Sequence, residues 1–127
     1  MKTILAIDDD PSMRDFYEQG LAIFGYTISS VEDADKARER LSEHLPDLII
    51  MDVMMPGVDG ISLTREFRTN AKTGHIPILV VSALADAATV NDALLFGAVD
   101  YLAKPVSVED LKAKIEHIFA LEEHRKK

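Results

Sequence analysis

The chain has 127 residues, the length of a single domain, and its lack of cysteine excludes disulfide scaffolds and cysteine-ligated zinc sites. Its 14 basic and 22 acidic side chains give a formal net charge of −8, so a cation or a basic partner suits it better than a nucleic-acid backbone. The apolar runs are too short to cross a membrane and no signal peptide is evident, so we expect a cytoplasmic protein.

The first half of the chain alternates apolar blocks with amphipathic ones. Residues 3–8 are apolar almost throughout, which is typical of a strand covered on both faces. Asp10 before Pro11 predicts a helix that runs toward Gly25. An extended stretch at residues 26–31 precedes a second helix, which is expected to end before Pro46. Its predicted inner side carries four apolar residues: Ala34, Ala37, Leu41 and Leu45.

A third strand is predicted at residues 47–52. The loop at residues 54–60 follows, because Pro56 fixes φ and the glycines at 57 and 60 permit positive φ. A less cleanly patterned helix is then expected over residues 61–68.

The last part of the chain continues the alternation. Residues 76–82 and 99–102 predict the fourth and fifth strands, and residues 86–96 a helix between them. That helix has Ala87, Val90 and Leu94 at helical spacing. Residues 107–110 resemble a capping box that opens the last helix. Its expected inner residues are Leu111, Ile115, Ile118 and Phe119.

Strict alternation of five strands with five helices predicts an α/β fold with a parallel sheet and helices on both faces. We expect the doubly wound, flavodoxin-like (βα)5 arrangement with strand order 2-1-3-4-5. The predicted domain covers residues 1–121. Residues 122–127 are expected to be a charged helix end or the start of a linker.

Carboxylates gather where this topology would bind a ligand, at the carboxyl ends of strands one and three. Asp8 and Asp9 follow the first strand and Asp52 ends the third, whereas Asp10 is expected to cap the next helix. Carboxylates held close together must bind protons, a cationic partner or a metal. Oxygen ligands favour Mg²⁺ over zinc, and Mg²⁺ sites commonly include phosphate.

Two further polar residues are predicted at the same edge of the sheet. Ser82 ends the fourth strand and Lys104 follows the fifth, so a hydroxyl and an ammonium can bind phosphoryl oxygens there. A carboxylate can itself accept a phosphoryl group. The four histidines show no ligand spacing and are expected at the surface: His44, His75, His117 and His124.

In combination, these residues resemble the receiver domain of bacterial response regulators, including chemotaxis-regulator-like ones, over essentially the whole chain. The resemblance comprises Asp8-Asp9, Asp52 followed by the segment 55–60, Ser82-Ala83 and the segment 101–105. It implies that Asp52 is the phospho-acceptor. It also implies that Asp8, Asp9, Asp52 and the Met54 backbone carbonyl hold Mg²⁺ or Mn²⁺.

The resemblance further implies that Ser82 and Lys104 stabilise the phosphoryl group, that Ser82 and Tyr101 form a switch, and that the Lys104–Pro105 bond is cis. The protein would then be a phosphorylation-activated signalling switch and not an enzyme, apart from assisting its own phosphorylation and dephosphorylation. Its implied partners are a histidine kinase or phosphotransfer protein. A downstream protein or further domain would bind the fourth helix, fifth strand and fifth helix, with no nucleic acid bound by this segment.

Two alternatives remain open. The Asp8-Asp9-Asp10 run also fits a phosphatase of the haloacid dehalogenase type, although Asp52 precedes Ser82 and Lys104, which is the wrong order for that family. A receiver-like interaction module that takes no phosphate is the other alternative. Transfer of a phosphoryl group to Asp52 distinguishes the switch from both.

Overall fold

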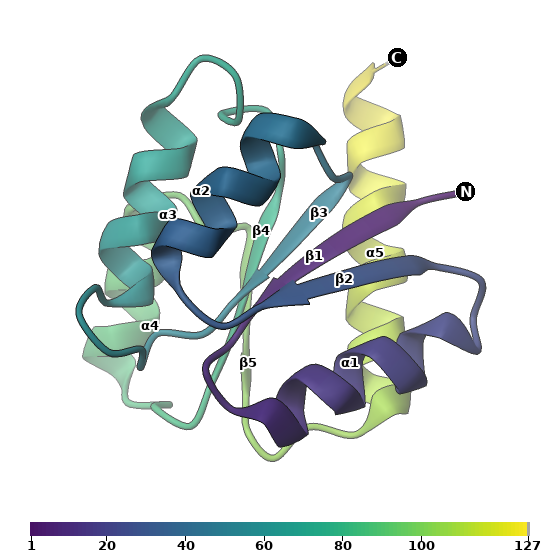
Figure 1. Cartoon of the computed structure of the whole chain (residues 1–127), viewed down its shortest axis with the longest axis horizontal. Helices are drawn as coiled ribbons and strands as arrows, with labels where there is room; N and C mark the ends of the chain where they lie inside the picture. The colour runs from purple at the N-terminus through teal and green to yellow at the C-terminus, as the bar shows by residue number, and fades with distance from the viewer. Residues whose placement is uncertain (127) are drawn as a thin grey trace.

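The computed structural model describes residues 1–126, which form a five-stranded parallel sheet between two layers of helices (Figure 1). The strand order β2-β1-β3-β4-β5 and the ten alternating elements confirm the predicted fold class. The strands are β1 (Thr3–Ile7), β2 (Thr27–Val31), β3 (Leu48–Met51), β4 (Ile78–Ser82) and β5 (Asp100–Ala103). The helices are α1 (Pro11–Ala22), α2 (Ala34–Glu43), α3 (Gly60–Thr69), α4 (Ala87–Leu95) and α5 (Val108–Lys126).

The three inner strands β1, β3 and β4 are mostly apolar on both faces, and helices cover both faces of the sheet. In β1, Ile4 and Ala6 contribute to the core beneath α1 and α5, whereas Leu5 and Ile7 contribute to the core beneath α2, α3 and α4. Successive strand residues point to opposite faces, so a strand between two helical layers needs apolar residues at every position. The continuous apolar run that predicted this strand therefore has a direct structural cause.

The pairing of β1 with β3 determines where the acidic residues lie. Ile7 is in register with Met51, so the next residue of each strand, Asp8 and Asp52, lies at the same edge of the sheet. The Asp52 amide donates to the Ile7 carbonyl at 3.0 Å, and the Asp8 amide donates to the Val31 carbonyl at 3.1 Å. Both aspartates are thus fixed by backbone hydrogen bonds at the end of the sheet.

Several of the other aspartates are helix caps and not site residues. Asp10, Asp33, Asp59 and Asp86 precede α1, α2, α3 and α4, and each side chain accepts a backbone N–H of the first turn. The predicted cap at Asp10 is confirmed. The Ser107 hydroxyl accepts the Asp110 amide at 3.0 Å at the start of α5, as the capping sequence indicated.

One predicted helix face is partly wrong, and the spacing noted in another helix does not mark its buried side. Leu45 is 41% exposed because α2 ends at Glu43, before the turn that would have carried Leu45 inward. In α4 the buried residue is Ala93, while Leu94 is 44% exposed. Apolar residues surround α4 on nearly every side, so the spacing cannot determine which side meets the sheet.

The glycines of the β3–α3 loop have different roles: of the two that permit positive φ, only Gly57 adopts it. Gly57 has φ +87°, a conformation that glycine adopts without steric cost. Gly60 is the first residue of α3 and is not among the residues with positive φ. A Cβ at this position would lie 1.9 Å from the Asp52 carbonyl oxygen, so Gly60 allows a close backbone approach.

The four histidines are exposed, as predicted. The charged segment at 122–127 continues α5 as far as Lys126, and Lys127 lies outside the described residues. The domain boundary at residue 121 stays a prediction. Within residues 1–126, no helix has both the length and the apolar character needed to cross a bilayer.

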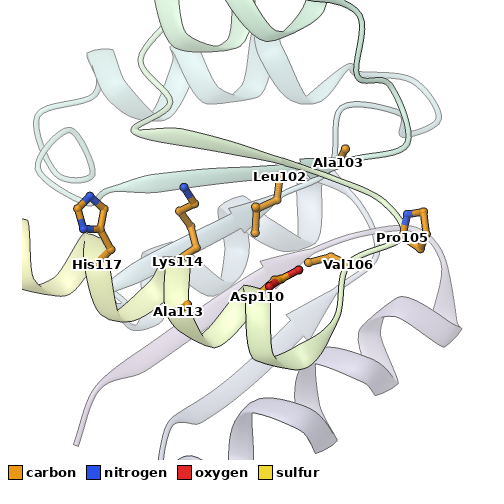
Figure 2. Close-up of a pocket in the computed structure, with 8 residues that line it drawn as sticks. All are labelled: Leu102, Ala103, Pro105, Val106, Asp110, Ala113, Lys114 and His117. Atoms are coloured by element: carbon orange, nitrogen blue, oxygen red, sulfur yellow. The ribbon is translucent and has the colours of Figure 1, made fainter.

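A cavity of about 320 Å³ lies between the end of β5 and α5 (Figure 2). Leu102, Pro105 and Val106 contribute apolar atoms, and Lys114 and His117 project from α5. Lys114 forms a salt bridge with Asp100, with 2.8 Å between the Lys114 Nζ and the Asp100 carboxylate. None of Asp8, Asp9 and Asp52 lines this cavity.

Candidate functional site

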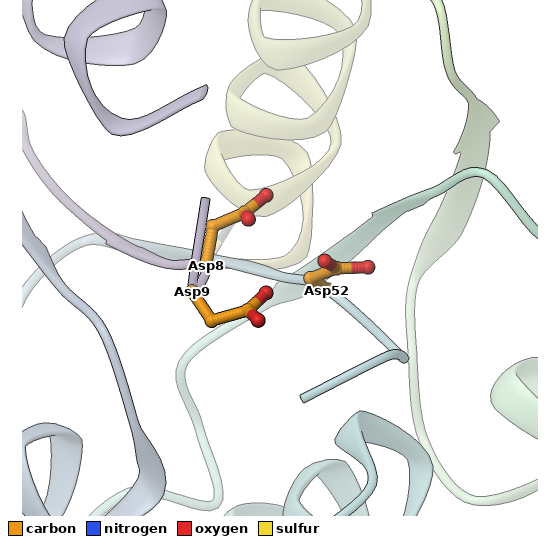
Figure 3. Close-up of side chains that lie close together, drawn as sticks. All are labelled: Asp8, Asp9 and Asp52. Atoms are coloured by element: carbon orange, nitrogen blue, oxygen red, sulfur yellow. The ribbon is translucent and has the colours of Figure 1, made fainter. Parts of the chain in front are cut away.

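Three carboxylates converge at the carboxyl ends of β1 and β3. One oxygen from each of Asp8, Asp9 and Asp52 lies within 4.8 Å of the others, which defines one shared space, and Figure 3 shows the three side chains close together. Asp8 is 0% and Asp52 5% exposed, while Asp9 is open to solvent. The convergence predicted from the strand ends is confirmed, with two carboxylates inside the protein and one at its rim.

Lys104 is the cation of this cluster. Its Nζ donates to Asp8 Oδ2 at 2.9 Å and to Asp52 Oδ2 at 3.3 Å, and its side chain is 17% exposed. Burial lowers its pKa, but the hydrogen bond to Asp8 and the charges of Asp8 and Asp52 outweigh burial, so the pKa is raised. Lys104 therefore remains an ammonium at neutral pH. Its peptide bond to Pro105 is cis.

The single positive charge of Lys104 does not neutralise the negative charges of the three carboxylates. Burial raises the pKa of Asp8 and the charge of Asp52 adds to this effect, against the lowering by hydrogen bonds from Lys104 and the Asp10 amide. Ionised Asp8 is therefore disfavoured in the folded protein. A further positive charge in the shared space would relieve this cost.

Ser82 and Tyr101 are connected through the backbone of Leu84. The buried Ser82 hydroxyl accepts the Leu84 amide at 3.2 Å. The Tyr101 hydroxyl donates to the Leu84 carbonyl. The two residues predicted to form a switch thus bind opposite sides of one residue in the β4–α4 loop.

The loop after β3 also contacts the Asp52 carboxylate. The Met54 amide donates to Asp52 Oδ1 at 3.3 Å. Gly60 donates its amide to the Val53 carbonyl at 2.8 Å and packs on the Asp52 carbonyl. The role predicted for the Met54 carbonyl stays a prediction.

Sequence reasoning missed two residues that hold the backbone of the site. Gly60 was interpreted only through its φ. Arg14 was not singled out, although its Nη1 donates to the Asp8 carbonyl at 2.8 Å. The sequence does place a basic residue one turn into the helix that follows the aspartates. Arg14 binds a backbone oxygen, however, and the pattern of side chains does not indicate such a contact.

The donor set fits a hard divalent cation. It offers three carboxylates within 4.8 Å and no sulfur or imidazole, and the buried Asp8 is destabilised as an anion. Mg²⁺ prefers one or two carboxylates with water and phosphate oxygens in its remaining positions. The exposed position of Asp9 leaves the shared space open to solvent on that side.

The comparisons with known proteins agree with this geometry. Residues 4–116 match the response regulator receiver domain family, and the chain belongs to that family. Fold and site thus define a receiver domain of two-component signalling, a regulatory phospho-acceptor domain that acts as a phosphorylation-activated switch. The match gives no support to the phosphatase alternative.

Individual relatives are similar over nearly the whole chain. The DNA-binding dual master transcriptional regulator RpaA of Synechocystis is 36% identical over 115 residues, which are 91% of this chain and 48% of RpaA. A CheY-like receiver domain protein of Methanospirillum hungatei has a TM-score of 0.91 at 25% identity, with 98% of each chain covered. The chain spans about half the length of the curated relatives that it matches.

A third similar structure bears on the cation. The receiver domain of the sensor histidine kinase PA1611 of Pseudomonas aeruginosa has a TM-score of 0.82 at 31% identity, covering 91% of this chain and 95% of that one. That structure has a magnesium ion coordinated in its active-site cleft.

Proposed function

We propose that Asp52 is the residue that accepts the phosphoryl group. The observation that carries this proposal is the position of its carboxylate, beside those of Asp8 and Asp9 and 3.3 Å from the Lys104 ammonium. An Asp52 oxygen forms the new P–O bond while the P–N bond of a phosphohistidine donor breaks, and the electron pair leaves on the imidazole nitrogen. The donor is a histidine kinase or phosphotransfer protein.

Asp8, Asp9, Asp52 and the Met54 carbonyl would hold Mg²⁺, or Mn²⁺ in its place. The ion would supply positive charge where phosphoryl oxygens meet the carboxylates. Lys104 already lies between Asp8 and Asp52, so its ammonium can pair with a phosphoryl oxygen on Asp52 with little movement. The same groups would assist hydrolysis of the phosphoryl group by water.

Ser82 and Tyr101 would transmit the change. The Ser82 hydroxyl accepts from the Leu84 amide, and its own proton can be donated to a phosphoryl oxygen. Turning Ser82 toward that oxygen weakens its bond to Leu84, whose carbonyl holds the Tyr101 hydroxyl. The β4–α4 loop and Tyr101 then change position together, which alters the surface of α4, β5 and α5.

That surface is the proposed output face. It includes the exposed side chains of Leu94 and Leu95 on α4. Because the relatives are transcriptional regulators of about twice the length, we propose that the face binds a further domain or a protein partner. This segment itself, with a net charge of −8, would bind no nucleic acid. The cytoplasmic location stays a prediction.

Intact mass spectrometry after incubation with acetyl phosphate and Mg²⁺ tests the acceptor. The wild-type chain should gain the mass of one phosphoryl group, and Asp52→Asn should not. Asp59→Asn is the matched control, because Asp59 caps α3 in the following loop and should not affect the gain. A wild-type chain that gains no mass would favour the interaction module, and a gain that persists in Asp52→Asn would point to another acceptor.

A further inference from the structure

Arg14 is a cationic side chain that contacts the backbone of the site. It lies on α1, is half-buried, and its Nη1 donates to the Asp8 carbonyl oxygen at 2.8 Å. Within residues 1–126 this is the only hydrogen bond of its guanidinium group. The contact therefore joins α1 to the turn that carries the acidic residues.

This bond fixes a part of the site that the other contacts leave open. The Asp8 carboxylate is held by Lys104 and by the Asp10 amide, and the Asp52 carboxylate by Lys104 and the Met54 amide. Within the described residues, the exposed Asp9 carboxylate has no hydrogen-bond partner. Its place near the other two carboxylates must therefore come from the backbone of its turn.

The Asp8 carbonyl belongs to the peptide group that joins Asp8 to Asp9. Peptide groups are planar, so holding the oxygen in place also fixes the direction in which the chain enters Asp9. The Asp8 amide is bonded to β2 and the Asp10 side chain caps α1, which leaves the guanidinium as the side-chain contact to the peptide between them. The Arg14 contact therefore holds the backbone that leads into Asp9.

We infer that Arg14 is a positioning residue of the cation site, acting on Asp9 through the Asp8 carbonyl. The inference rests on the proposed binding of a divalent cation by Asp8, Asp9 and Asp52. Groups that orient metal ligands without touching the metal commonly change metal affinity by about tenfold or more when they are lost.

Charge and positioning have opposite effects here, which makes the inference testable. A positive charge near three carboxylates opposes the binding of a cation, so its removal alone would tighten binding. Loss of positioning would weaken binding. Arg14→Lys separates the two effects, because it keeps the charge but lacks the planar, longer-reaching donor group of arginine.

The experiment measures Mg²⁺ affinity by isothermal titration calorimetry, and hydrogen exchange of the Asp10 amide, which donates to Asp8 Oδ1, by NMR without metal. Arg14→Lys should weaken Mg²⁺ binding about tenfold and speed exchange at that amide. Arg40→Lys is the matched control: Arg40 is a half-buried arginine of α2 that lines a cavity with Thr3 and Thr27, at the opposite end of the strands. It should leave both measurements unchanged.

Affinity and exchange equal to wild type in Arg14→Lys would overturn the inference. The same holds if Arg14→Met binds Mg²⁺ more tightly while Arg14→Lys is unchanged, because Arg14 would then act through charge alone. If the wild-type chain binds no Mg²⁺, the cation site of the proposed function is wrong. The metal-free exchange rates would still decide whether Arg14 orders the turn.

Discussion

Asp8 is the residue at which the demands of folding and of the site conflict most. It is fully buried, its closest cationic partner is also shared with Asp52, and its pKa is raised by burial and by the Asp52 charge. A raised carboxyl pKa means that the ionised form is less favourable in the folded chain than in the unfolded chain. At neutral pH Asp8 therefore lowers the stability of the cation-free protein.

Asp8→Asn should raise the free energy of unfolding by about 1 kcal/mol at pH 7 in the absence of divalent cations, since it removes a buried charge and keeps an oxygen for the Asp10 amide. Urea denaturation with a chelator present measures this. Asp100→Asn is the opposite case. Burial alone would raise the pKa of Asp100, but its bonds to Lys114 and the Tyr101 amide outweigh burial and lower it, so this variant should be less stable. A less stable Asp8→Asn would contradict the argument.

Residues at strand ends were predictable, whereas those that hold the backbone were not. Asp8, Asp52 and Lys104 follow strands and Ser82 ends one, and parallel topology alone brings such residues to one edge. Gly60 packs on the backbone carbonyl oxygen of Asp52, at the other end of the loop between β3 and α3. Every residue has a backbone carbonyl oxygen, so no pattern of side chains along the sequence shows which of these oxygens will be contacted.

At the level of elements, α2 and α3 are joined by one arginine. Arg38 of α2 donates from Nε and Nη2 to the two carboxylate oxygens of Glu66 on α3, each at 2.8 Å. Its Nη1 donates to Asp35 at 2.8 Å. The hydrogen bond from Arg38 lowers the pKa of Glu66, against a smaller opposing effect of burial.

Glu66→Gln should lower the free energy of unfolding by about 0.5–1 kcal/mol at pH 7, because the pair is solvent-exposed but bidentate. Because the pKa of Glu66 is lower in the folded chain than in the unfolded chain, its ionised form stabilises the fold at pH values above the unfolded pKa. That stabilisation is lost as the pH falls through the folded pKa. The difference in free energy of unfolding between variant and wild type should therefore have its largest value at pH 7 and shrink below about pH 4.5, the pKa of an unfolded glutamate. Urea denaturation across this range measures it. A difference that does not vary with pH would show that the ion pair is not its source.

Element types were better predicted than element faces. The strands and most helices carry a clear period, and a cap precedes each of α1, α2, α3 and α4. The spacing of Ala87, Val90 and Leu94 does not mark the inner side of α4, because a helix with apolar residues around most of its circumference has no preferred side. Contact with the neighbouring elements then decides that Ala93 is buried and Leu94 is not.

At the scale of the whole molecule, binding of a cation is expected to stabilise the fold. Asp52 is far along the chain from Asp8 and Asp9, so the three carboxylates come together only in the folded state and Mg²⁺ would bind that state selectively. At about ten times the dissociation constant, Mg²⁺ should add ~1.4 kcal/mol to the free energy of unfolding.

Thermal denaturation with Mg²⁺ and with excess chelator measures this stabilisation. Asp9→Ala should weaken Mg²⁺ affinity by about tenfold and reduce the stabilisation accordingly. Asp33→Ala is a control for loss of a carboxylate, since Asp33 caps α2 and is not part of the cluster. Equal stabilisation of Asp9→Ala and wild type would remove Asp9 from the ligand set.

The sequence by itself determined the alternation of elements, the doubly wound sheet and the edge at which the polar residues meet, because periodicity and capping are local and the handedness of crossovers is general. Tertiary structure alone decided how deep each carboxylate lies, that Lys104 bridges Asp8 and Asp52, and that Leu84 lies between Ser82 and Tyr101. These depend on distances between segments far apart in the chain, which only packing of the finished core fixes.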